Sequence, residues 1–253
     1  MTTTYLAGEK ASPSHDLEVP ARALAIGAHP DDIEFGCGGT LAKWAAKACE
    51  IFHLVCTDGS KGTWDPNIKP ADLAQRRQKE QTDAARILGG NTPVTFLGWT
   101  DGELESGMIQ RSQVVETIRR LKPDVLLAHD PWKRYRLHPD HRHAGFLATD
   151  GVVAARDPLF FPELGAPHRP SKILLWEADQ PDHEETIEEE NFQKKLLALK
   201  AHASQYESTM GINQLDDPSQ MAAFEQRLRT RLLDNSLSGG AKLSEVFKLI
   251  DKV

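Results

Sequence analysis

Two short motifs carry side chains that could bind a metal ion and move a proton. The first contains His29 and Asp32, three residues apart, and the second contains His138 and His141 at the same spacing. Imidazole and carboxylate groups bind zinc, iron or nickel, and catalytic sites typically use three protein ligands and leave a position open. If His29, Asp32 and one later histidine held zinc, Asp31 would lie beside the ion as a free carboxylate. Asp31 could then act as general base toward the activated water while the remaining histidine stabilises the oxyanion or protonates the leaving group, which suffices for hydrolysis of an amide.

Both motifs follow segments that we predict to be buried strands. Short apolar segments alternate along the chain with amphipathic ones, which is typical of a parallel sheet covered by helices. The predicted strands are 21–28, 51–57, 94–97, 124–128 and 172–176, and the predicted helices between them are 36–48, 71–88, 108–121 and 140–155. Ligands of such sheets bind beyond the carboxyl ends of the strands, so we expect both motifs at one sheet edge. The predicted fold class is α/β: a Rossmann-like three-layer fold with a mainly parallel sheet and helices on both faces.

The two ends of the chain are predicted to lie outside this sheet. Residues 1–20 are polar and contain proline, so we expect a flexible N-terminal arm before a single α/β domain over 21–253. The acidic run 182–190 is interpreted as a solvated loop and helix start, because acidic side chains favour a helix N-terminus. The helices predicted over 191–205, 219–233 and 241–253 form a C-terminal helical extension, which from residue 219 onward offers contacts for a possible homo-oligomer.

Composition excludes several classes of protein. The 253 residues carry a formal net charge of −7, whereas nucleic-acid binders usually have a basic surplus. The chain has no apolar run of about 18 residues, so we expect no integral membrane segment, and residues 1–20 lack the apolar core of a signal peptide. Three cysteines, an odd number, fit free thiols in a reducing compartment, so we expect a cytoplasmic protein.

Each motif taken alone also has a purely structural interpretation. A lone His-x-x-His pair is often two surface histidines on a helix, and Asp31 or Asp32 could cap the helix that follows. The glycine-rich segment 36–39 does not complete a dinucleotide-binding loop, which would need glycine where Leu41 stands. We therefore expect these glycines to allow close packing of helix and strand. Two motifs at matched strand ends favour a metal site over the separate structural interpretations.

The same motifs resemble those of the LmbE-like (PIG-L) family of zinc-dependent N-deacetylases. Ala28–Asp32 and Gly36–Leu41 match the opening of the family, and His138–Arg142 matches its second motif. The resemblance runs from about Arg22 to about Gln205. Further residues that fit are Arg77, Glu80, Leu97–Trp99, Asp101–Gly102, His129–Trp132, Lys195 and His202–Gln205. Members of this family remove acetyl groups from substrates that contain N-acetylglucosamine, so the resemblance implies that activity here.

The resemblance also implies a role for each residue of the two motifs. By this likeness His29, Asp32 and His141 hold the zinc ion, and Asp31 is the general base that takes a proton from the zinc-activated water. His138 then stabilises the tetrahedral oxyanion or protonates the leaving amine. The implied cofactor is Zn²⁺ and the implied partner is a small amino-sugar substrate.

Residues outside the two motifs have less specific signals. The resemblance places Arg77 and Asp101 near sugar hydroxyls, although Arg77 could instead pair with Glu80 on a helix surface and Asp101 could belong to an ordinary turn. His129 or Asp130, at the end of a predicted strand, could orient a zinc ligand. The rim of the pocket is expected from the loops 59–70, 99–105 and 131–137.

Three functions compete on these observations. The leading one is a metal-dependent hydrolase that removes the acetyl group from an N-acetylated amino sugar or its conjugate. Two histidines and one aspartate also suit a non-haem iron enzyme, but those ligands usually lie on a jelly-roll barrel and not on an alternating α/β sheet. A non-catalytic sugar-binding relative is the third, since a fold alone does not determine function. A pure binder would have no need of Asp31 beside the metal.

Overall fold

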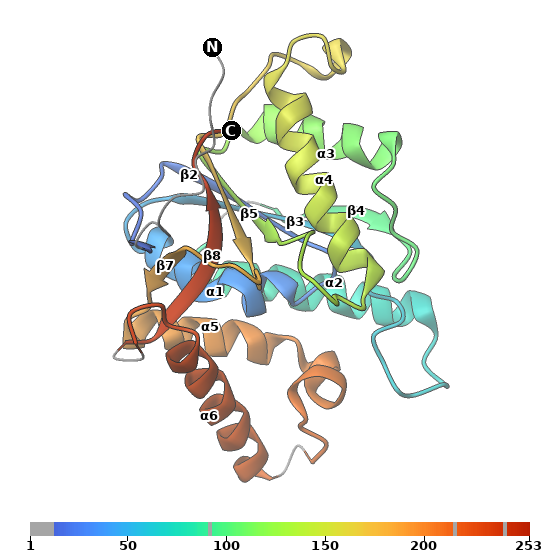
Figure 1. Cartoon of the computed structure of the whole chain (residues 1–253). Coiled ribbons are helices and arrows are strands. Elements are labelled where there is room, and N and C mark those ends of the chain that lie inside the picture. The colour runs from blue at the N-terminus through green and yellow to red at the C-terminus, as the bar shows by residue number, and fades with distance from the viewer. Residues whose placement is uncertain (1–12, 91–92, 215–216, 240–241) are drawn as a thin grey trace.

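A mixed sheet of eight strands runs through the protein in the order β1-β7-β8-β6-β5-β2-β3-β4 (Figure 1). The computed structural model describes residues 13–90, 93–214, 217–239 and 242–253. The strands are β1 (Ser14–His15), β2 (Arg22–Gly27), β3 (Glu50–Thr57), β4 (Thr95–Trp99), β5 (Val125–His129), β6 (Lys172–Trp176), β7 (His183–Thr186) and β8 (Ser244–Ile250). The α-helices are α1 (Asp32–Ala45), α2 (Pro70–Ile87), α3 (Met108–Leu121), α4 (Pro139–Arg156), α5 (Glu189–Ala201) and α6 (Pro218–Asp234).

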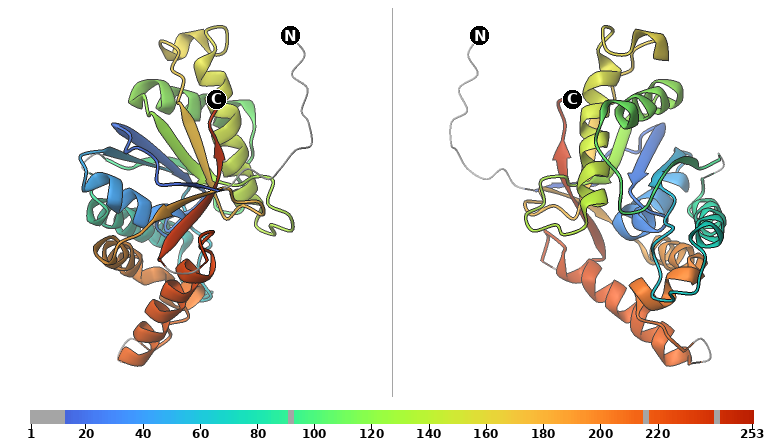
Figure 2. Two further views of the ribbon diagram at one scale, coloured as in Figure 1. Left: turned by 60° about the vertical axis from the view of Figure 1, so that its left-hand side comes forward. Right: turned by 90° about the vertical axis from the view of Figure 1, so that its right-hand side faces the viewer.

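Side chains of the central strand β2 alternate between two hydrophobic cores, because successive residues of a strand point to opposite faces. Leu24 and Ile26 belong to the core that α3 and α4 cover. Ala23 and Ala25 belong to the core that α1, α2 and α5 cover. Figure 2 shows helices on both sides of the sheet. The predicted three-layer α/β fold with a mainly parallel sheet is therefore confirmed.

The C-terminal segment that we predicted to be a helix is a strand. β8 pairs antiparallel with both β6 and β7, and Phe247 is fully buried between them opposite Trp176 and His183. Leu243, Val246, Phe247 and Ile250 are spaced as on one face of a helix, which explains the wrong prediction. In the structure the edge of β6 that does not face β5 forms backbone hydrogen bonds with this segment. That pairing overrides the helical spacing of its apolar residues.

The acidic run is a helix start at its end, where α5 begins at Glu189, but its first part is the buried strand β7 and not a solvated loop. Glu184 and Glu185 are 2% and 0% exposed. Glu185 Oε2 accepts a hydrogen bond from Lys43 at 2.7 Å, and its Oε1 accepts one from the backbone of Leu17 at 2.8 Å. Buried carboxylates are tolerated where such partners offset their desolvation. These partners come from distant parts of the chain, so the charge pattern alone could not reveal the burial.

Part of the expected N-terminal arm belongs to the sheet. Ser14 and His15 form β1, which pairs in parallel with β7. Ser14 Oγ also lies 2.8 Å from His183 Nδ1. The arm predicted over 1–20 is therefore wrong at these positions, and residues 1–12 lie outside the described residues.

Two features of α1 bring it close to the edge of the sheet. Its backbone is non-helical at Cys37, where φ is −147°. A Cβ at Gly36 would lie 2.5 Å from the ring of Trp176, so only glycine allows helix and β6 to approach this closely. After the kink, Glu245 of β8 accepts hydrogen bonds from the backbone of Gly39 and Thr40. The expectation that the glycines serve close packing agrees with this geometry.

The chain after α5 is irregular where we predicted a continuous helix to residue 205. α5 ends at Ala201 and is followed by a 3₁₀ turn (Ala203–Gln205) and a π-helix (Tyr206–Met210). Single-turn π-helices occur frequently at functional sites. Among the described residues, no helix combines the length and the apolar character that a membrane crossing requires.

Candidate active site

A cavity of about 610 Å³ lies at the edge of the sheet where β2, β5 and β6 end. All seven residues that the sequence singled out line it: His29, Asp31, Asp32, Arg77, Asp101, His138 and His141. The first motif follows β2 and the second begins α4, so the topology joins segments 112 residues apart. The two motifs therefore lie where the strand-end argument predicts them.

Donor atoms of three side chains lie close together in this cavity. His29 Nδ1 lies 3.2 Å from His141 Nε2 and 3.3 Å from Asp32 Oδ2, and Asp32 Oδ1 lies 3.3 Å from His141 Nε2. A zinc ion bound tetrahedrally at about 2.0–2.1 Å needs donors about 3.3–3.4 Å apart, so these side chains fit such an ion. Overlapping sets of donors within 4.8 Å of one another add His138 on one side and His129 on the other. Two of these sets share His141, and a third set, of His29, Asp101, His138 and Asp140, shares His29 and His138 with the first, so we treat them as one candidate metal centre.

Two buried carboxylates hold the far side of the His29 ring. His29 Nε2 lies 3.1 Å from Asp140 Oδ2 and 3.2 Å from Asp101 Oδ1. Asp140 is completely buried and also accepts hydrogen bonds from the backbone of Gly102 and Leu104. Carboxylates that take the second N–H of a metal-ligating histidine set its orientation and tautomer. We did not predict this contact for Asp140, although it lies inside the second motif, and Asp101 contacts His29 as well as the cavity.

Replacing Asp140 with asparagine should weaken metal binding about 10- to 100-fold, because the amide holds the His29 ring less firmly than the carboxylate. Competition with a chromophoric chelator measures the affinity. The matched control is Asp150→Asn on the same helix, since Asp150 contacts Arg111 and not the cavity. Equal metal affinity in the two variants would reduce Asp140 to a cap for the turn at residues 102–104.

Asp31 combines burial with a strained backbone. It is 5% exposed, and its φ of +105° lies in a region that residues other than glycine rarely adopt. Burial raises the pKa of Asp31 to about 6, and the nearby charge of Asp32 adds to this, whereas Arg77 opposes it. Its Oδ2 has no hydrogen-bond partner among the described residues. A carboxylate oxygen without a hydrogen-bond partner, on a group whose pKa is raised to about 6, is suited to accept a proton.

His138 stands at the open side of the candidate metal centre. It precedes α4 directly, is exposed, and lines the cavity. Its ring centroid lies 4.6 Å from that of His29 and 4.8 Å from that of His141. Burial of part of the ring, with the charge of His29, lowers the pKa of His138. The position would allow contact with a bound substrate.

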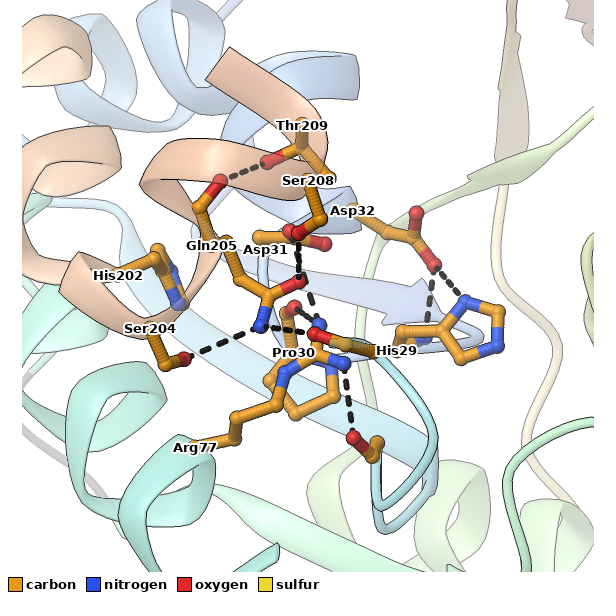
Figure 3. A network of polar contacts seen from close by, with 12 residues as sticks. His29, Pro30, Asp31, Asp32, Arg77, His202, Ser204, Gln205, Ser208 and Thr209 are labelled. Atoms are coloured by element: carbon orange, nitrogen blue, oxygen red, sulfur yellow. Dashed lines mark hydrogen bonds and ion pairs between the residues drawn. The ribbon is translucent and has the colours of Figure 1, made fainter. Parts of the chain in front are cut away.

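Arg77 is buried, which makes the predicted alternative of a surface pair with Glu80 wrong. Its guanidinium donates to the carbonyl oxygen of Pro30 at 2.5 Å and lies 3.6 Å from Asp31 Oδ2 (Figure 3). The neighbouring Arg76 takes the exposed position and pairs with Glu80 at 3.0 Å. Arg76 and Arg77 point to different sides of α2, because an α-helix turns about 100° per residue.

His129 and Asp130 differ in what they contact. His129 Nδ1 accepts a hydrogen bond from Trp176 Nε1 at 3.0 Å, so its proton is on Nε2, which lies 3.2 Å from Asp32 Oδ2. His129 is therefore placed to orient Asp32. Asp130 instead accepts a hydrogen bond from the backbone of Trp132 in the following turn. Cys37 is buried in the kink of α1 and belongs to none of the donor sets found among the described residues.

The walls of the cavity come partly from segments that we did not predict to border it. Lys61 and Asp101 belong to loops that we expected, but no described residue of 131–137 lines the cavity. Gln205, Thr209 and Arg231 line it instead, from the turn after α5, the π-helix and α6. In Figure 3 Gln205 and Thr209 project from the segment that faces Arg77. Only the packing of the C-terminal helices brings these residues to the sheet edge.

This fold, with histidines and aspartates gathered at the carboxyl ends of its strands, defines the class of protein. Residues 24–152 match the sequence model of the PIG-L family, described as GlcNAc-PI de-N-acetylase, and the chain belongs to this family. It is 36% identical over 189 residues to diacetylchitobiose deacetylase from Thermococcus kodakarensis, covering 73% of this chain and 70% of the relative. It is 31% identical over 203 residues to the 1D-myo-inositol 2-acetamido-2-deoxy-alpha-D-glucopyranoside deacetylase of Streptomyces avermitilis, covering 70% and 67%.

A solved structure shares the same architecture. The N,N'-diacetylchitobiose deacetylase of Pyrococcus horikoshii superposes with a TM-score of 0.81 at 30% sequence identity. The match covers 92% of this chain and 84% of that one. The α/β fold and the family are thus supported by sequence and by structure.

Proposed function

We propose that this protein is a zinc-dependent deacetylase that hydrolyses the N-acetyl group of a small amino sugar or its conjugate. The observation that carries the proposal is the close approach of His29, Asp32 and His141, whose donor atoms lie pairwise 3.2–3.3 Å apart, with the buried Asp31 carboxylate beside them. Two histidines and one carboxylate are a known ligand set of catalytic zinc. The same donor set would also accept iron, and elemental analysis distinguishes the two metals.

The proposed mechanism assigns a task to each side chain. Bound zinc would supply Lewis-acid polarisation of the amide carbonyl and lower the pKa of water. Asp31 accepts a proton as water attacks the carbonyl carbon. His138 either protonates the departing nitrogen or stabilises the oxyanion, in which case Asp31 passes its proton to that nitrogen. Cleavage of the C–N bond then releases acetate and a free amine. Asp140 and His129 hold His29 and Asp32 in place throughout.

The substrate class follows from what the relatives share. The names of both curated relatives refer to deacetylation of an N-acetylated sugar, in one as diacetylchitobiose and in the other as an inositol glycoside. A cavity of about 610 Å³ is within the usual range for small-molecule sites, about 300–1,000 Å³. Arg77 and Asp101 are proposed to border the bound sugar, whereas the role of the C-terminal helices in a homo-oligomer stays a prediction.

Three free, buried cysteines fit a reducing compartment, so we place the enzyme in the cytoplasm.

The test combines elemental analysis with an assay for free amine. Protein purified without chelators should carry about one zinc per chain and release amine from N-acetylglucosamine, diacetylchitobiose or N-acetylglucosaminyl-inositol. Chelation should abolish the release and added zinc should restore it. Sugar binding without amine release would favour the non-catalytic relative. Bound iron together with oxygen uptake would favour the non-haem iron enzyme.

A further inference from the structure

A buried polar network lies behind Asp31, on the side away from the cavity. It consists of Glu34 in α1, His53 in β3, Gln81 in α2 and His202 after α5. These four side chains are at most 3% exposed, and none of them lines the cavity. They therefore contact no substrate, and any effect on the reaction has to pass through a residue that does. The network is distinct from the two motifs that the mechanism uses.

Gln81 connects this network to the candidate general base. Its Oε1 accepts the hydrogen bond of the Asp31 backbone N–H at 3.0 Å, and its Nε2 donates to Glu34 Oε1 at 2.7 Å. The orientation of the amide is unambiguous, because a backbone N–H can only donate and an ionised carboxylate can only accept. Glu34 thus determines which end of Gln81 faces Asp31.

A histidine lies beside each oxygen of the Glu34 carboxylate. His202 Nε2 lies 3.3 Å from Glu34 Oε2, and His53 Nδ1 lies 4.0 Å from Glu34 Oε1. The turn that carries His202 is fastened to α2, since Ser204 donates to Glu80 through both its backbone and its hydroxyl. Two helices, a strand and a turn therefore converge on one carboxylate.

The backbone of Asp31 needs such support. A non-glycine residue at φ +105° is strained and persists only where its surroundings impose the conformation. The hydrogen bond to Gln81 restrains the peptide that sets the direction of the Asp31 side chain. If this peptide relaxed, the carboxylate would move relative to His29 and Asp32, and small displacements of reacting groups can reduce rates by about 100-fold.

We propose that Gln81, oriented by Glu34 and His202, is a positioning residue that holds Asp31 in the conformation from which it accepts the proton. This inference rests on the proposed function, because it assumes that Asp31 is the general base. Gln81 and Glu34 lie behind the two motifs and affect the reaction through the backbone conformation of Asp31. In this proposal the buried Glu34 carboxylate orients the side-chain amide of Gln81 and does not contact the substrate.

The test is Gln81→Met, which keeps the side-chain length and removes the acceptor. We expect kcat to fall about 10- to 100-fold while KM changes less than about twofold and the metal content is unchanged. Exchange of the Asp31 amide with deuterium, followed by NMR, should accelerate about fivefold because its hydrogen bond is lost. The matched control, Gln75→Met on the exposed face of the same helix, should leave all four quantities as in the wild type.

Glu34→Gln provides a second variant if Gln81→Met does not fold. It preserves volume but leaves the orientation of Gln81 unspecified, so kcat should again fall without a rise in KM. Wild-type kcat in folded Gln81→Met, or a loss confined to KM or to metal content, would overturn the proposal. Wild-type protein that is inactive on every N-acetyl sugar would count against the proposed function alone, and amide exchange at Asp31 would still decide whether Gln81 restrains that peptide.

Discussion

Replacing Asp31 with asparagine should lower kcat for amide hydrolysis about 10²- to 10⁴-fold while the protein keeps its metal, because only the proton acceptor is removed. Asparagine is the appropriate substitution, since it has nearly the volume of aspartate and tolerates positive φ better than most residues. The φ of +105° at this position would place an additional strain on alanine or any bulky residue. Steady-state amine release and elemental analysis of the same preparation measure the two quantities.

The adjacent carboxylate supplies the contrast. Asp32→Asn changes the same chemical group one residue away, but Asp32 faces His29 and His141 and is expected to bind the metal. That variant should lose metal together with activity. If Asp31→Asn also lost its metal, Asp31 would be a ligand, and the assignment of the general base would have to be revised. Full activity in Asp31→Asn would remove the residue from the chemistry.

His29→Ala should reduce the metal content from about one zinc per chain to near zero and the activity to that of chelated protein. The reason is that Nδ1 of His29 is one of the expected metal ligands, while its Nε2 contacts Asp101 and Asp140. Without the imidazole these buried carboxylates repel one another and no longer have a common partner. Elemental analysis after gel filtration, alongside circular dichroism to check the fold, measures the effect.

His143→Ala is the matched control, because His143 lies two residues after His141 but contacts Ser106 and not the cavity. It should keep wild-type metal content and activity. A His29→Ala protein that retained stoichiometric metal would show that the ion is bound elsewhere. The overlapping donor set of Asp32, His129 and His141 would then be the first alternative to test.

The central part of the fold could be predicted because its signals are local. β2 and β5 are continuous apolar segments, and α3 spans Met108–Leu121 as its periodicity predicts. Because ligands of such sheets bind at the carboxyl ends of the strands, the two motifs could be predicted to lie together without any knowledge of contacts. Strands β7 and β8 were missed for the opposite reason. β7 is acidic and β8 has the spacing of a helix, and both are strands only because they pair with distant segments.

For the candidate site, the sequence by itself determined which side chains are available: two histidine-aspartate motifs at matched strand ends and a free carboxylate beside the expected metal. The tertiary structure alone decided which groups orient them. Asp140 reaches His29, His129 reaches Asp32, and Gln81 reaches the backbone of Asp31. Spacing along the chain reports the period of a helix or strand, whereas these contacts join residues 50 to 111 positions apart through packing and buried hydrogen bonds.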